Sequence, residues 1–268
     1  MRSTKSHENA RKNAKTPLPL IPLMPEANAR AILLDIEGTT TPVTFVYEVL
    51  FPYARSHVRE FLQQNYDSED LQSDLRALKA EHRSDIEQRH EPPVWFDDSD
   101  EIELESATQY VYWLMDQDRK STALKAIQGK IWKDGYLSGQ LRGQVFPDVV
   151  PAFRRWKEQQ RSIHIFSSGS ILAQKLLFAH TNEGDLTSYL REYFDTTTGP
   201  KTNAGSYASI SEKIEVPAAE ILFVSDINGE LDAALESGMQ TALCVRQESG
   251  TTENCKHQIV RTFEVIFP

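Results

Sequence analysis

The chain has 268 residues, of which 40% are hydrophobic and 25% charged, as is usual for a globular protein of one large or two smaller domains. Its 29 Lys and Arg face 39 Asp and Glu, so the net charge is -10 and binding to nucleic acid through a basic surface is not expected. No apolar run approaches the roughly 18 residues of a membrane-spanning helix, so a transmembrane protein is excluded.

The charge is unevenly distributed along the chain. Residues 1–30 hold six basic and two acidic residues, whereas the other 238 residues hold 23 basic and 37 acidic ones. Residues 1–15 are polar and lack the apolar stretch of a secretory signal, and we expect residues 1–30 to be a flexible, solvated basic tail. A mitochondrial presequence is the alternative, against which Glu8 and the prolines count. Cys244 and Cys255 have no metal-ligand spacing, which favours reduced thiols inside the cell.

The first predicted strand is the short apolar run of residues 31–35, which ends on Asp35. A turn-rich segment follows it, from Gly38 to Pro42. From Tyr47 to about Gln64, apolar residues recur at helical spacing, so a helix is predicted there.

The middle of the chain is predicted to be helical throughout. Residues 67–105 contain 14 acidic and 4 basic residues, with a helix expected over 71–90, and residues 102–140 again have a helical apolar stripe. No strand pattern occurs between about residues 50 and 160. We therefore expect a helical insertion over residues 48–144.

Strands and helices alternate in the last part of the chain. Further strands are predicted at 162–167, 193–196, 221–226 and 241–245, and helices at 171–180, 204–214 and 229–237. This alternation predicts an α/β fold, an open parallel sheet with helices on both faces. The expected core comprises residues 31–47 and 145–268.

Polar side chains follow these strands. Asp35 and Glu37 come after the first strand; the others are Ser167 with Ser168, Lys201 and Asp226. Ligands bind outside the carboxyl ends of the strands in such sheets, so we expect these groups to converge. Carboxylate oxygens suit a magnesium ion, while hydroxyls and an ammonium suit a phosphate group.

The charges of such a site must be compensated. A phosphate dianion beside Asp35 or Asp226 is repelled by about 4 kcal/mol at 4 Å and an effective dielectric constant of about 20. A divalent cation together with Lys201 offsets most of this repulsion. A nearby Asp35 carboxylate and a dry pocket would raise the pKa of Glu37, as a general acid requires, whereas magnesium would lower it.

These motifs resemble those of the haloacid dehalogenase-like hydrolases. Asp35-Ile-Glu37-Gly-Thr resembles the first motif of that superfamily, and Ser167 resembles the second. Lys201 resembles the third motif, and Asp226 with Glu230 resembles the fourth. Between residues 31 and about 245 the sequence more closely resembles one family, the enolase-phosphatases or acireductone synthases. The stretches that carry this resemblance are L-L-D-I-E-G-T-T-T-P, L-F-P-Y, D-R-K-S-T-A-L-K, S-S-G-S-I-L-A-Q-K-L-L-F and F-D-T-T-T-G-P-K.

The resemblance implies an enzyme of methionine salvage that uses one magnesium ion per subunit. It would enolise 2,3-diketo-5-methylthiopentyl 1-phosphate and then hydrolyse the phosphate, releasing the acireductone 1,2-dihydroxy-3-keto-5-methylthiopentene. It further implies a monomer located in the cytoplasm and, in eukaryotes, the nucleus.

The resemblance also implies roles for single residues. Asp35 would be the nucleophile and a metal ligand, and Asp226 a second metal ligand. Glu37 stands where the superfamily usually has a second Asp; its carbonyl would ligate the metal and its side chain would serve as acid and base. Ser167, Ser168 and Lys201 would hold the phosphate, and Glu230 would support the site from one helical turn beyond Asp226.

Each residue also has a purely structural interpretation. Ser167 and Ser168 could cap the helix beginning near Ser170, and Asp35 could be a turn acid. Taken together, the candidate site residues favour the functional interpretation. For Glu230 the structural and the functional interpretations both stay open. The insertion would be a cap over the site, and its candidate pocket residues are Lys120, Lys125, Trp113 and Tyr136. The base for enolisation is open: it lies in the cap, or Glu37 serves.

Three rival functions remain. The first is a phosphatase of the same superfamily that acts on another small phosphate ester. The core motifs do not distinguish it from an enolase-phosphatase, and only the cap stretch at 118–125 disfavours it. A haloacid dehalogenase needs no magnesium, so Glu37 and Asp226 disfavour it. A catalytically inactive binding module would have lost a motif residue such as Asp35, and none is lost.

Overall fold

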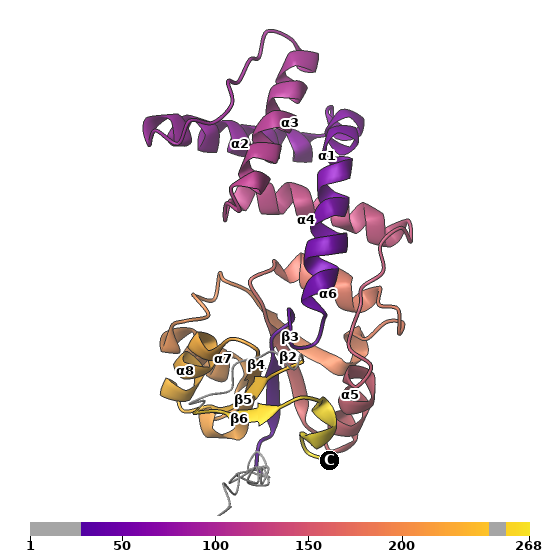
Figure 1. The fold of residues 1–268 in the computed structure, drawn as a ribbon, viewed down its shortest axis with the longest axis vertical. Coiled ribbons are helices and arrows are strands. Elements are labelled where there is room, and N and C mark those ends of the chain that lie inside the picture. Colours follow the sequence, from indigo (N-terminus) through magenta and orange to yellow (C-terminus); the bar gives the residue numbers. More distant parts are fainter. Residues whose placement is uncertain (1–27, 247–255) are drawn as a thin grey trace, which may run out of the picture.

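The structure is a computed structural model, and it describes residues 28–246 and 256–268. Figure 1 shows a part built on a sheet and, above it, a part built of helices. We call α1–α4 with the segments between them (51–137) the helical part, and the remaining described residues the α/β part. The basic tail lies outside the described residues except for 28–30.

The α/β part contains a six-stranded parallel sheet with the strand order β3-β2-β1-β4-β5-β6. The strands are β1 (Ala31–Leu34), β2 (Ser162–Phe166), β3 (Leu190–Phe194), β4 (Ile221–Ser225), β5 (Gln240–Cys244) and β6 (Gln258–Val260). β1 lies between β2 and β4 and its four residues are all buried. A continuous apolar run suits this position because both faces of the strand are covered.

Two layers of helices cover the sheet. α5 (Val149–Glu158) and α6 (Ile171–Ala179) share one apolar core with Ile32 and Leu34 of β1. α7 (Ala204–Ile214) and α8 (Asn228–Glu236) share the other with Ala31 and Leu33. The predicted α/β class, with an open parallel sheet between helices, is therefore confirmed.

One α-helix and one strand of the α/β part were not predicted. Helix α5 presents buried residues at helical spacing, from Val149 to Trp156, so its signal was in the sequence. Strand β6 has only three residues and too short an apolar run to be recognised. The 3-10 helices Thr187–Tyr189, Ala218–Glu220 and Phe263–Val265 are single turns at strand or chain ends.

The helical part follows β1 through a π-helix, Phe45–Leu50. Its helices are α1 (Phe51–Asn65), α2 (Glu69–Glu87), α3 (Asp100–Asp116) and α4 (Thr122–Leu137). Serine hydroxyls at Ser68, Ser99 and Ser121 accept backbone N–H bonds and start the last three helices. The stretch predicted as helical over 102–140 is therefore two helices, because Ser121 begins a new one after Asp118 turns left-handed (φ 47°).

Within residues 28–246 and 256–268, no helix combines the length and the apolarity needed to cross a bilayer. The Cys244 thiol is free and buried in β5, and burial raises its pKa to about 12. Cys255 lies outside the described residues.

Candidate active site at the strand ends

Asp35 and Lys201 meet at the carboxyl ends of the strands. Asp35 directly follows β1 and is 5% exposed, and its Oδ1 accepts hydrogen bonds from Lys201 Nζ at 2.6 Å and from the Ile36 N–H at 2.8 Å. Lys201 Nζ also lies 2.7 Å from Glu230 Oε2. Burial alone would lower the pKa of Lys201, but these two carboxylates outweigh it and raise it, so the ammonium stays charged.

Asp226 approaches the backbone of the first motif from the end of β4. Gly38 has φ +71°, and a Cβ atom there would lie 2.2 Å from Asp226 Oδ2. Only glycine tolerates both this backbone conformation and the close carboxylate. Burial, and then the charge of Asp35, raises the pKa of Asp226 to about 7. The segments that carry Asp35, Gly38 and Asp226 thus form one site.

Two glutamates complete the acidic set. The pKa of Glu37 is raised by burial and then by the Asp35 charge, although Lys201 opposes the shift. The pKa of Glu230 is raised for the same two reasons. A carboxyl group with a raised pKa can hold a proton and donate it, as general acid catalysis requires.

The site therefore contains four carboxylates and one ammonium, counting Asp35, Glu37, Asp226 and Glu230 against Lys201. The excess negative charge is the setting in which a divalent cation is favoured. Among the described residues, no three acidic, His or Cys side chains form a ready-made metal cage. Magnesium does not need one, because it commonly binds one or two carboxylates and keeps several waters. The carboxylates of Asp35 and Asp226 with the Glu37 carbonyl fit that requirement.

The serine pair lies between β2 and α6. Ser167 is 2% exposed, and its Oγ accepts the Gly169 N–H at 3.1 Å. The helix cap itself is Ser170, whose Oγ accepts the Ala173 N–H, so capping does not occupy Ser167 or Ser168. The Ser168 side chain is exposed. Both serines precede the N-terminus of a helix, where backbone N–H groups favour an anion.

Sequence reasoning missed Ser225, the last residue of β4. Its fully buried hydroxyl lies 3.2 Å from Asp35 Oδ2 and 3.0 Å from Glu230 Oε2, and it accepts the Ile227 N–H at 3.1 Å. It therefore bridges two of the carboxylates. The only signal in the sequence was its place immediately before Asp226.

Arg246 was also missed. Its guanidinium donates to the Thr39 carbonyl at 2.7 and 3.0 Å and pairs with Asp148 at 2.6 Å. It lies over the rings of Phe146 and Phe263, at 4.3 and 4.4 Å. Arg246 thereby fixes the turn that follows Glu37, from 207 residues away in the chain.

The four candidates from the helical part have different positions. Lys125 of α4 reaches the α/β part, where its Nζ donates to the Ser168 carbonyl at 3.3 Å. Lys120 is exposed in the segment before α4. Trp113 stacks on Tyr110 within the helical part at 5.8 Å.

Tyr136 is buried and stacks on His180 at 5.6 Å. His180 follows the C-terminal end of α6, whereas Ser168 precedes its N-terminal end. Tyr136, one of the candidate pocket residues, therefore packs near the end of α6 that is far from Ser168.

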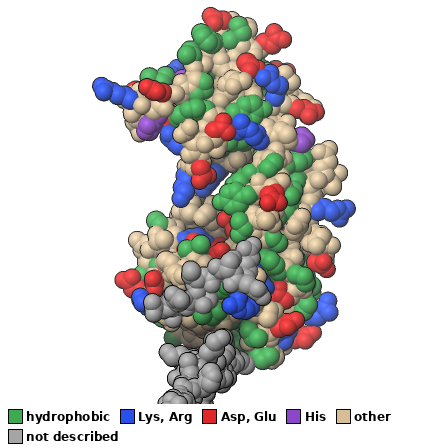
Figure 2. Space-filling view, viewed as in Figure 1, with side chains coloured by type: hydrophobic (Ala, Val, Ile, Leu, Met, Phe, Trp, Pro, Cys, Tyr) green, Lys and Arg blue, Asp and Glu red, His purple; other side chains and the backbone are tan. Residues whose placement is uncertain are grey.

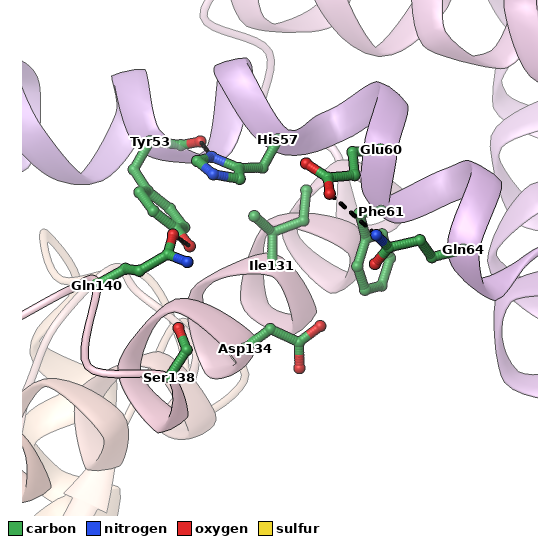
Figure 3. A pocket seen from close by; sticks show the side chains of 9 residues that line it. All are labelled: Tyr53, His57, Glu60, Phe61, Gln64, Ile131, Asp134, Ser138 and Gln140. Carbon is green, nitrogen blue, oxygen red and sulfur yellow. Dashed lines mark hydrogen bonds between the residues drawn. The ribbon is translucent and has the colours of Figure 1, made fainter.

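The surface is hollowed between the two parts of the molecule, and charged side chains of both signs line the hollow (Figure 2). A separate cavity of about 220 Å³ lies between α1 and α4 (Figure 3). Its side chains bind one another: the Tyr53 hydroxyl donates to Gln140 at 3.1 Å, and Gln64 donates to Glu60 at 2.9 Å. None of the strand-end residues lines this cavity.

Comparison with known proteins finds relatives that match most of the chain. The sequence profile of haloacid dehalogenase-like hydrolases matches residues 29–238. The chain is 48% identical to enolase-phosphatase E1 of Synechococcus elongatus over 233 residues, which cover 87% of this chain and 95% of the relative. It is 38% identical to enolase-phosphatase E1 of Danio rerio, with 88% and 94% covered.

A solved structure is also similar. The crystal structure of the UTR4 protein from Saccharomyces cerevisiae superposes with a TM-score of 0.71 at 34% identity. The match covers 88% of this chain and 99% of the yeast chain. The similarity therefore includes both the helical part and the α/β part.

Proposed function

The chain belongs to the enolase-phosphatase E1 family of haloacid dehalogenase-like hydrolases, and we propose that it enolises 2,3-diketo-5-methylthiopentyl 1-phosphate and then removes the phosphate. The product is the acireductone 1,2-dihydroxy-3-keto-5-methylthiopentene of methionine salvage. The observation that carries the proposal is the buried contact of Asp35 with Lys201, beside the Asp226 carboxylate at Gly38.

Asp35 is the nucleophile of the second reaction. One of its carboxylate oxygens attacks the phosphorus atom, the bond from phosphorus to the ester oxygen breaks, and an aspartyl-phosphate forms. The contacts of Asp35 with Lys201 and the Ile36 N–H hold the carboxylate in one orientation. Attack thus starts from a fixed geometry, which lowers its entropic cost.

Glu37 supplies the proton for the leaving ester oxygen. Its raised pKa supports this role, because a carboxyl group at its ordinary pKa holds few protons near neutrality. In the second half-reaction the resulting carboxylate takes a proton from the water that attacks the aspartyl-phosphate. Phosphate then leaves and Asp35 is restored.

Lys201 and the serines bind the phosphate group. Lys201 offers a buried ammonium, and Ser167 and Ser168 offer hydroxyl and backbone groups at the start of α6. Glu230 keeps Lys201 in place through the ion pair at 2.7 Å, so it supports the site rather than contacting the substrate.

Magnesium would be held by Asp35, Asp226 and the Glu37 carbonyl, one ion per subunit. When bound, it offsets negative charge on the phosphate and the carboxylates. We further propose that residues 48–144 form a cap that excludes water from the site. It stays a prediction that the protein is a monomer in the cytoplasm and nucleus. It also stays a prediction that residues 1–30 are a basic tail.

The decisive experiment supplies the pure protein with the diketo phosphate and magnesium. We expect the ultraviolet band of an ene-diol together with inorganic phosphate, and we expect Asp35→Asn to lose phosphate release by at least about 1,000-fold while remaining folded by circular dichroism. Phosphate release at the parent rate from this variant would refute the role of Asp35. Release of phosphate from other esters, with no ene-diol from this substrate, would instead favour a phosphatase for another small ester.

A further inference from the structure

Lys125 differs from the other half-buried cations of the helical part in its binding partner. Four of its Lys and Arg side chains are half-buried: Lys79, Arg119, Lys125 and Lys130. Lys79, Arg119 and Lys130 each pair with a carboxylate at 3.1 Å or closer. Within the described residues, Lys125 has no carboxylate within 4.0 Å, and its hydrogen-bond partner is the neutral carbonyl of Ser168 at 3.3 Å. The charge of Lys125 does lower the pKa of Asp195, but from beyond the 4.0 Å of an ion pair. Its half-buried ammonium therefore keeps N–H groups for a ligand on which negative charge develops.

The position of Lys125 is set by the start of helix α4 and by the packing of α4 on α6. Ser121 begins α4 by accepting the Leu124 N–H at 3.0 Å, and its hydroxyl donates to Glu81 of α2 at 2.5 Å. One turn beyond Lys125, a Cβ atom at Gly129 would lie only 3.8 Å from Leu172 of α6. Helix α4 therefore packs against the start of α6, and Lys125 lies beside Ser168, one of the residues proposed to bind the phosphate.

Lys125 and Lys201 come from different parts of the molecule and contact different groups. Lys201 comes from the α/β part and is committed to Asp35 and Glu230. Lys125 comes from the helical part and reaches Ser168, at the edge of the proposed phosphate site. A substrate whose phosphate is held by the α/β part must project its other end towards the helical part. The first atoms beyond the phosphate are C1 and the two carbonyl groups.

We propose that Lys125 is a catalytic residue of the enolisation, in which it binds the carbonyl oxygen at C2 and stabilises the negative charge that develops there. This inference rests on the proposed function. The C1–H bond breaks and its electron pair forms the C1=C2 double bond. The π pair of the C2 carbonyl moves to its oxygen, which takes a proton from the Lys125 ammonium. The proton from C1 passes to the Glu37 carboxylate, so the step is an isomerisation and needs no oxidant. A preorganised cation facing a developing oxyanion commonly accounts for a large share of the rate.

The test separates enolisation from phosphate chemistry by means of a non-hydrolysable phosphonate analogue of the diketo phosphate. In heavy water, NMR follows exchange of the C1 hydrogens, and the C4 hydrogens report background exchange. We expect Lys125→Met to lower enzyme-dependent C1 exchange by about 100-fold or more and Lys125→Arg to restore part of it. The affinity for inorganic phosphate, measured by calorimetry, should stay within about 2-fold, because the phosphate is held by the α/β part.

The matched control is Lys133→Met, which removes an exposed lysine from the same helix and should leave both measurements unchanged. Unchanged C1 exchange in Lys125→Met overturns the proposal. So does an equal loss of C1 exchange and phosphate affinity, because Lys125 would then bind the phosphate or merely hold the two parts together. If the parent protein itself produces no C1 exchange, the enolase function fails, whatever the variants show.

Discussion

Asp85 in the helical part and Asp226 in the strand-end site are both largely withdrawn from water, yet their surroundings differ. Burial alone would raise the pKa of Asp85, but hydrogen bonds from His90, Tyr110 and Arg119 outweigh it and lower the pKa. The Tyr110 and Arg119 contacts measure 2.6 and 2.7 Å. Asp226 has the opposite shift, to about 7, because burial and the Asp35 charge act in the same direction.

This contrast distinguishes charges that serve folding from charges that serve binding. In the helical part the buried Asp85 carboxylate is surrounded by Tyr110 of α3 and by Arg119 and His90 of the segments between the helices, so its charge stabilises the arrangement. At the strand ends, carboxylates face one another with a single lysine between two of them. We expect such a set to destabilise the fold, and the magnesium ion proposed above would offset its negative charge.

The largest effect on stability is expected at Asp85. Replacing Asp85 by Ala leaves the buried Tyr110 hydroxyl and the Arg119 guanidinium without their acceptor, and we expect a loss of about 2–4 kcal/mol in the free energy of unfolding. Because its folded-state pKa is lowered, the contribution of Asp85 is present above the unfolded pKa of about 4 and disappears as the pH falls through the folded value. Urea unfolding at pH 7 and at pH 3 measures both effects.

An exposed acid of the neighbouring helix provides the control. Asp116→Ala removes a carboxylate that is 60% exposed, and it should change the stability at pH 7 by less than about 1 kcal/mol. If Asp85→Ala is no more destabilising than Asp116→Ala, the distinction between the two kinds of charge fails for the helical part.

Asp226 should behave in the opposite way. In the presence of a chelator, Asp226→Asn removes a repelled carboxylate, and we expect stabilisation by about 1–3 kcal/mol at pH 8, together with loss of phosphatase activity. The raised folded-state pKa means that the cost of Asp226 is fully present above about pH 7 and shrinks as the pH falls towards 4, where the unfolded state also takes up the proton. The difference in melting temperature between parent and variant should therefore narrow from pH 8 to pH 5.

Magnesium provides the complementary measurement. It should raise the melting temperature of the parent protein but not that of Asp226→Asn, because ligand binding stabilises only the form that binds. A variant that is less stable than the parent in chelator at pH 8 would contradict the idea that this carboxylate is kept at the expense of stability.

Much of the fold followed from local signals. Short apolar runs predict the buried strands. The serine caps and the left-handed turn at Asp118 explain why the stretch over 102–140 divides into two helices. Propensity and periodicity describe neighbours in the chain. They could not reveal β6, whose three residues become a strand only because β5 is beside them.

The site was predictable to the extent that it depends on strand ends. Asp35, Lys201 and Asp226 converge because parallel strands present their carboxyl ends at one edge. Ser225 and Arg246 were not predictable, because their roles depend on contacts across about 190 and 207 residues. Gly38 is intermediate: the turn was expected, but the reason for glycine is the Asp226 carboxylate 2.2 Å from its missing Cβ.

The smallest effect is expected at the surface of the helical part, where Arg55 of α1 pairs with Asp116 of α3 at 2.9 Å. These side chains are 45% and 60% exposed, so water and salt screen the attraction and ordering the long arginine side chain offsets much of it. Arg55→Ala should lower the stability by less than about 1 kcal/mol, a shift of at most about 4 °C in melting temperature. Raising the salt concentration to 1 M should remove most of the difference between parent and variant. A larger, salt-independent loss would mean that Arg55 acts through packing on the Tyr112 ring, 4.8 Å away, and that exposed charges also hold the helical part together.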